Sequence, residues 1–154
     1  MVVVLIRTAV VGAALLIAAN ANAFDEASIQ KLTAEGECPK CDLSGADLNA
    51  GEFVGASFSN ANLSGANLAE VVFNEAKLNG TNLRGADLSD AILVDAQMEG
   101  ADLTGAKLDE TVLDGANLTG AVGLTQAQLD ETCDEGTGDS ATLLPTGLIL
   151  KQCE

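Results

Sequence analysis

The chain contains no histidine, tryptophan or tyrosine, and only four of its 154 residues are phenylalanine. Histidine is the commonest general base and metal ligand, so its absence excludes Ser-His and Cys-His catalytic pairs and imidazole metal sites. Aromatic rings contribute much of an ordinary globular core. We therefore expect a narrow core of aliphatic side chains, and we do not expect an enzyme.

Basic residues are scarce as well, since 7 Lys and Arg stand against 23 Asp and Glu, for a formal net charge of −16. A nucleic-acid-binding surface needs Lys and Arg to neutralise phosphates, so this composition argues against direct binding of nucleic acid. It suits solubility, the attraction of cations or a basic partner. The length allows one domain.

The first nineteen residues are almost entirely apolar, and Arg7 is their one charged residue. Ala21-Asn22-Ala23 follows and matches an A-x-A cleavage site, which predicts a signal peptide over residues 1–23. The alternative is an uncleaved membrane anchor, because the stretch is nearly long enough to span a bilayer. We expect export to the periplasm or cell exterior, or to the thylakoid lumen if the source is photosynthetic, with membrane contact only through this segment if it is retained.

Every fifth residue from Leu43 to Leu118 is large and apolar. The sixteen residues are Leu43, Leu48, Phe53, Phe58, Leu63, Leu68, Phe73, Leu78, Leu83, Leu88, Leu93, Met98, Leu103, Leu108, Leu113 and Leu118. Eleven of the residues two positions earlier are Ala, and Gly is commonest two positions later. A period of five fits neither a helix nor a flat strand. A chain that turns by about 90° every five residues explains it, because the large and small residues then both point inward and four units close a square coil.

Units such as Ala61-Asn62-Leu63-Ser64-Gly65 and Ala101-Asp102-Leu103-Thr104-Gly105 resemble the pentapeptide-repeat family, and the resemblance covers residues 41–121. The segment from Cys38 to Leu43 is also similar to the start of the repeat in exported members. The resemblance implies an all-β fold, a right-handed quadrilateral β-helix. Sixteen units give about four coils, a stack ~19 Å tall.

The two ends of such a solenoid need covers, because the last coil exposes apolar core and unpaired strand edges. Residues 25–35 predict a short helix with Ile29 and Leu32 facing the first coil. Thr125–Gln128 is a capping box that predicts a helix from about Gln126 to Cys133. The expected organisation is a signal peptide in 1–23, a capping helix in 24–37, the solenoid in 38–121, and a second capping helix with a disulfide-stapled tail in 122–154.

Four cysteines follow the export signal: Cys38, Cys41, Cys133 and Cys153. An even number in an exported chain predicts disulfides, with Cys133–Cys153 joining the tail to the second helix and Cys38–Cys41 closing a tight loop. A zinc site would require a second pair of closely spaced cysteines, and haem attachment would require a histidine after Cys41. A redox-active pair normally lies at the N-terminus of a helix that follows a strand. Disulfides are therefore favoured, and no cofactor is expected.

Alignment of the repeat in rows of twenty shows that its four faces differ. The face centred on Phe53 and Phe73 has apolar residues at outward positions where other faces have Asp, Asn or Ser. We call these residues the apolar stripe: Val54, Val72, Ile92, Val94 and Val112. A contiguous exposed apolar patch often marks an interface, so we predict dimerisation or docking of a protein partner here. The alternatives are that β-branched residues merely suit extended backbone, or that a terminal segment covers them.

Beside the stripe, Glu70, Asp90 and Glu110 recur at one corner of the coil, twenty residues apart. Carboxylates stacked ~5 Å apart repel one another unless they are screened. A hard cation such as Ca²⁺ is the candidate ligand. Solvated corner charges are the simpler interpretation.

The favoured function is a non-catalytic, exported scaffold or protein-interaction module. One alternative is implied by the family, some of whose members imitate duplex DNA and inhibit DNA gyrase. The net charge suits that role, but it requires a chain retained in the cytoplasm. The third is a β-helix enzyme that acts on glycosidic bonds through two carboxylates. It is disfavoured because small external side chains on a short stack offer no pocket.

Overall fold

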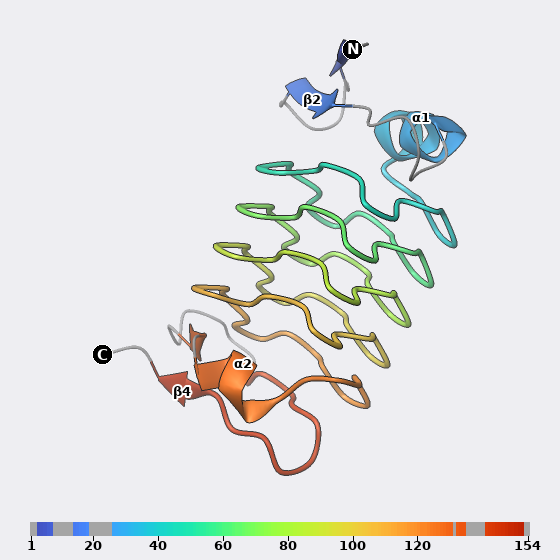
Figure 1. Ribbon diagram of the computed structural model, residues 1–154. Helices are drawn as coiled ribbons and strands as arrows, with labels where there is room; N and C mark the ends of the chain where they lie inside the picture. The colour runs from blue at the N-terminus through green and yellow to red at the C-terminus, as the bar shows by residue number, and fades with distance from the viewer. Residues whose placement is uncertain (1–2, 8–13, 19–25, 131, 135–140, 153–154) are drawn as a thin grey trace.

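The computed structural model describes residues 3–7, 14–18, 26–130, 132–134 and 141–152 (Figure 1). Its elements are β1 (Val3–Arg7), β2 (Ala14–Ala18), α1 (Glu26–Glu35), α2 (Gln126–Asp130), β3 (Cys133–Asp134) and β4 (Lys151–Gln152). Strands β1 and β2 pair antiparallel, and β3 and β4 pair parallel. A stacked spiral occupies the chain between the two helices. Among the described residues, no helix is both long and apolar enough to cross a membrane.

The spiral is held together by parallel bridges between residues twenty positions apart, from Glu37↔Ser57 to Asp102↔Val122. Each five-residue side of a coil contributes one bridging residue and two residues in a turn. The fold is therefore a repeat solenoid, but its sides are single bridges and not the longer strands that an all-β prediction suggests. A side that must turn again after five residues has no room for a longer strand.

Backbone hydrogen bonds repeat on every side of the coil. Leu63 N–H donates to the carbonyl of Asn82 at 2.8 Å, and Asn82 N–H donates back to the carbonyl of Ala61 at 2.9 Å. Within a coil, Ala66 N–H donates to the carbonyl of Leu63 at 3.1 Å and closes the corner turn. These bonds satisfy the polar groups of a backbone that has little regular strand.

Each side of the solenoid contributes two columns of residues to the core. One contains the large centres, and the other contains the small residues two positions before them. All sixteen predicted centres are buried, which confirms the period of five as the core pattern. Thr81 and Thr111 replace Ala in the small column, and their hydroxyls donate to the carbonyls of Phe58 and Leu88 at 2.8 Å. Each of these two buried hydroxyls therefore has a hydrogen-bond acceptor.

Helix α2 begins with the predicted capping box. Thr125 N–H donates to the side chain of Gln128 at 2.9 Å, and Gln128 N–H donates to the Thr125 hydroxyl at 3.3 Å. The helix ends at Asp130, earlier than predicted. Thr132 closes the end, because its N–H and its hydroxyl both donate to the carbonyl of Leu129, and Cys133 then pairs with Lys151 in the β3–β4 sheet.

The tail after α2 continues the ladder of the solenoid, which the sequence did not predict. Leu143 forms a parallel bridge with Asn117, and Leu118 N–H donates to its carbonyl at 2.7 Å. The hydroxyl of Thr142 donates to the carbonyl of Leu113 at 2.9 Å. A segment without the repeat thus takes the place of a further coil on this side.

Candidate interaction face

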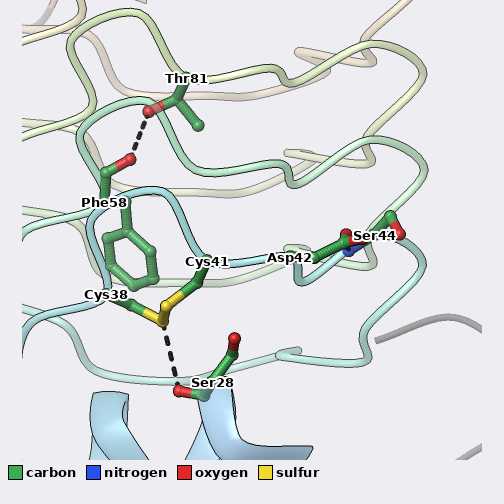
Figure 2. Close-up of a disulfide and its surroundings, with 7 residues drawn as sticks. All are labelled: Ser28, Cys38, Cys41, Asp42, Ser44, Phe58 and Thr81. Atoms are coloured by element: carbon green, nitrogen blue, oxygen red, sulfur yellow. Dashed lines mark hydrogen bonds between the residues drawn. A yellow bond between two sulfur atoms is a disulfide. The ribbon is translucent and has the colours of Figure 1, made fainter. Parts of the chain in front are cut away.

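Cys38 and Cys41 form a disulfide at the N-terminal end of the solenoid, which confirms that predicted pair (Figure 2). Cys38 is fully buried, and its sulfur lies 3.2 Å from the carbonyl oxygen of Ser28 in α1. A disulfide sulfur carries no proton, so this is a contact and not a hydrogen bond. The bridge thus fixes the first turn of the solenoid where α1 meets it. Cys153 lies outside the described residues, so the Cys133–Cys153 bridge stays a prediction.

Removal of this bridge is expected to cost about 2 kcal/mol of unfolding free energy, because the loop that it closes is short and constrains the unfolded chain little. The test is urea unfolding of wild type and Cys38→Ala/Cys41→Ala under oxidising conditions. Leaving Cys133 and Cys153 intact keeps any second bridge equal in both proteins. Equal midpoints with equal m-values would contradict the prediction.

The structure brings the apolar stripe together on one outer side of the solenoid. Val72, Ile92 and Val112 follow one another in a column of parallel bridges. Val54 is 54% exposed and Ile92 is 36% exposed. Val72, Val94 and Val112 are half-buried. The stripe is thus partly open to solvent and is not covered along its whole length.

Exposed Glu52 begins the same column of bridges, and two further polar residues share this side; none of the three was predicted. Asn74 and Asp114 alternate with Val54 and Val94 in the column next to the bridges. Asp114 is 1% exposed, and the Oδ1 atom of Asn74 is buried with no hydrogen-bond partner among the described residues. The alignment in rows of twenty shows both positions, but an Asn or Asp there has nothing to distinguish it from those on other faces.

Acidic residues occupy the corners on both borders of the stripe. We call them the acidic rails: Glu70, Asp90 and Glu110 on one border, and Glu75 and Asp95 on the other. All five are exposed and have φ between 55° and 59°, a conformation in which most corners of the coil carry glycine. The first rail was predicted from the sequence and the second was not, although both lie in the same rows of twenty.

The structure does not assemble the predicted cation site from Glu70, Asp90 and Glu110. No group of three or more His, Cys, Asp or Glu in the described part of the chain is arranged to hold a metal ion. All three side chains are exposed at the corners of successive coils. Solvated corner charges describe these residues better.

Two of the four basic side chains on the solenoid form ion pairs, both on other faces. Lys107 Nζ lies 2.7 Å from Asp87, and Arg84 lies 3.1 Å from Asp102. The hydrogen bond from Lys107 lowers the pKa of Asp87 to about 2. Neither the stripe nor its two corners contains a Lys or Arg. The face therefore combines apolar residues at its centre with borders whose charged residues are all acidic.

The profile of the pentapeptide-repeat family matches residues 41–71, 66–105 and 96–133, in eight copies. HetL, a pentapeptide repeat protein involved in heterocyst differentiation regulation from the cyanobacterium Nostoc sp. strain PCC 7120, is 40% identical with a TM-score of 0.50, over 51% of this chain and 37% of its own. QnrB1, a plasmid-mediated fluoroquinolone resistance protein, is 30% identical with a TM-score of 0.51, over 53% of this chain and 42% of its own.

A pentapeptide repeat protein from the thylakoid lumen of Arabidopsis thaliana is 32% identical with a TM-score of 0.45, over 62% of this chain and 74% of its own. The chain spans less than half of the length of HetL and QnrB1. No curated protein matches it. The profile match covers more than half of the chain, and with the bridges at twenty-residue spacing it leads to one conclusion: this chain belongs to the pentapeptide-repeat family.

Proposed function

We propose that the protein is a non-catalytic, exported scaffold that binds a protein partner through the apolar stripe. The observation that carries the proposal is the exposure of Val54 and Ile92, at 54% and 36%, on a solenoid whose other outward side chains are polar in most positions. Contiguous apolar surface is costly to leave in water and is typical of interfaces. A rigid stack of coils also presents such a surface without a large entropic cost on binding.

Export is supported by the apolar segment before Ala21-Asn22-Ala23 and by the Cys38–Cys41 disulfide. Disulfides persist in oxidising compartments and are rare in the cytoplasm. We infer that residues 1–23 are a signal peptide and that the mature chain begins at Phe24. Its compartment is then the periplasm, the cell exterior or a thylakoid lumen.

We infer further that the two helices close a solenoid of four coils. Leu32 of α1 and Leu129 of α2 are both buried in the same core as the repeat centres. The side-chain amide of Gln128 donates to the carbonyls of Leu103 at 3.3 Å and Ala106 at 2.7 Å. Both helices therefore cover apolar surface at the ends of the stack, and α2 also binds two of its backbone acceptors.

Ile92→Asp tests the stripe as the binding surface. We expect the affinity of the variant for the partner to fall about tenfold or more, because a carboxylate at the centre of an apolar contact must be desolvated. The measurement compares proteins captured from the exported fraction of the source organism by wild type and variant. The binding difference is then reproduced with the purified partner.

The matched control is Gln97→Asp. Gln97 is exposed, lies in the same coil and occupies the same bridging position on the next side. It should capture the same partner as wild type. Circular dichroism checks that Ile92→Asp is folded. If the folded variant captures the same proteins with the same yield as Gln97→Asp, the stripe is not the binding surface.

A second candidate is mimicry of duplex DNA toward a DNA-binding enzyme, which the net charge of −16 favours. This function requires that the chain stay in the cytoplasm. Mass spectrometry of the protein from cell fractions decides between the two. Cytoplasmic protein that retains residues 1–23 would favour mimicry, and exported protein beginning at Phe24 would favour the scaffold.

A further inference from the structure

We propose that the partner contacts the apolar stripe through a basic amphipathic segment, with apolar side chains over the stripe and Lys or Arg over the acidic rails. This inference rests on the proposed function, since it names the chemistry of the partner that the same face takes. A second copy of this chain does not fit the face.

The residues of the acidic rails have a backbone conformation that favours glycine. Glycine adopts positive φ freely, whereas other residues pay for it. The corners at Gly45, Gly65, Gly85 and Gly105 follow this rule. Eight described residues other than glycine have positive φ, and five of them are the acidic rails. Carboxylates are thus concentrated at the two corners that border the stripe, where the backbone alone would favour glycine.

The charge of the rails is not compensated within the described part of the chain. Salt bridges there join Lys107 to Asp87 and Arg84 to Asp102, all of which lie on other sides of the coil. Two rows of carboxylates around an apolar centre create a negative potential that like charges avoid and cations approach. Complementary charge across an interface both speeds association and selects the partner.

A two-fold dimer through this face would bring the rails of one copy against those of the other. Such an interface is isologous, so the same patch meets itself. Each copy would supply the five carboxylates of the rails and that of Glu52, and no Lys or Arg, to the contact. Opposed like charges cost free energy, so the rails favour a basic partner over self-association.

The width of the face suits one helix. Each side of the coil has about three extended residues, roughly 10 Å at 3.3 Å per residue. An α-helix with its side chains is about 10–12 Å across. Lys and Arg have long stems, so residues on the flanks of such a helix would reach the corners. The same face contains Asn74, whose buried Oδ1 lacks a hydrogen-bond partner among the described residues.

The test uses the full chain and a synthetic amphipathic helix of about 18 residues, with Leu along one face and Lys on both flanks. A second peptide has Glu in place of Lys. By fluorescence anisotropy, we expect the Lys peptide to bind at least about tenfold more tightly than the Glu peptide. The difference should shrink between about 0.05 M and 0.3 M NaCl, because salt screens exposed charges.

Two triple variants separate the rails from net charge. Glu70→Gln/Asp90→Asn/Glu110→Gln neutralises one rail, and Glu35→Gln/Glu37→Gln/Glu99→Gln removes the same charge from exposed residues away from the face. The rail variant should weaken binding of the Lys peptide about tenfold, and the control variant should weaken it less than threefold. Equal weakening by both would overturn the proposal, as would tight self-association of wild type lost in Ile92→Asp.

The outcomes of the two proposals are distinguishable. If Ile92→Asp abolishes partner capture but the Lys and Glu peptides bind wild type equally, the stripe is an interface and the basic partner is wrong. If Ile92→Asp captures the partner like wild type, the stripe itself is wrong. Tight binding of the Lys peptide that requires both Ile92 and the rail supports both proposals.

Discussion

Phe73→Ala is expected to lower the free energy of unfolding by about 3–5 kcal/mol. Phe73 is fully buried, and its ring lies 5.2 Å from that of Phe58 and 5.6 Å from that of Phe53, measured between centroids. In a core filled mostly by aliphatic side chains, these three rings pack against one another across successive coils. Neighbouring coils are held by their backbone ladder and cannot close over the missing ring, so a cavity remains.

The measurement is urea unfolding of wild type, Phe73→Ala and Phe73→Leu. Leu is the residue at most other centres, so Phe73→Leu keeps an apolar side chain there and should cost less than about 2 kcal/mol. A loss below about 1 kcal/mol for Phe73→Ala would show that the coils collapse around the gap. That result would contradict the explanation that the backbone ladder prevents the coils from closing over the cavity.

Gly123→Ala is expected to cost roughly 3 kcal/mol, from the strain of a left-handed residue together with overpacking. Gly123 has φ of 73°, and a Cβ atom there would lie 2.5 Å from Cα and 2.6 Å from N of Thr104. Neither of these backbone atoms can rotate away. The chain must therefore move off the coil before it can enter α2.

Gly120→Ala is the matched control, because Gly120 has φ of 69° but a Cβ atom there meets nothing within 4 Å. It should cost only the left-handed strain, about 1 kcal/mol. Thermal unfolding of both variants measures the difference, and hydrogen exchange at Leu129 shows whether α2 opens first. Equal losses at the two positions would mean that contact with Thr104 contributes nothing.

The core of the repeat was predictable because side-chain size alone decides which residues can lie inside a square coil. The series of large buried centres stops at Leu118. The next centre is Gly123, whose backbone packs directly on Thr104. The single-bridge character of each side was not predicted, because the period gives the position of a side and not how much of it is extended.

Contacts outside the repeat were harder to predict. Leu143 takes its place beside Asn117 without any periodic signal, since one apolar residue in a tail carries no register. The early end of α2 depends on Thr132, whose hydroxyl competes for the carbonyl of Leu129. Both outcomes follow from contacts with the folded solenoid, which a local pattern cannot contain.

The face of the candidate site was predicted in part. The apolar stripe and the first acidic rail follow from rows of twenty, because residues in one row position share one side of the solenoid. Glu75 and Asp95 were not predicted as a second rail. Two acidic residues at one row position are not distinguished by sequence from the many other polar residues of the repeat.

The pairing of Leu143 with Asn117 has a consequence for how the molecules behave at high concentration. An open parallel ladder is a template on which the next chain can add, and repeated addition produces a fibre. Here the template is occupied on one side by the chain's own tail, and Gln128 binds two carbonyls on another. The chain's own tail and helix α2 thus block the addition of a further chain at this end of the solenoid.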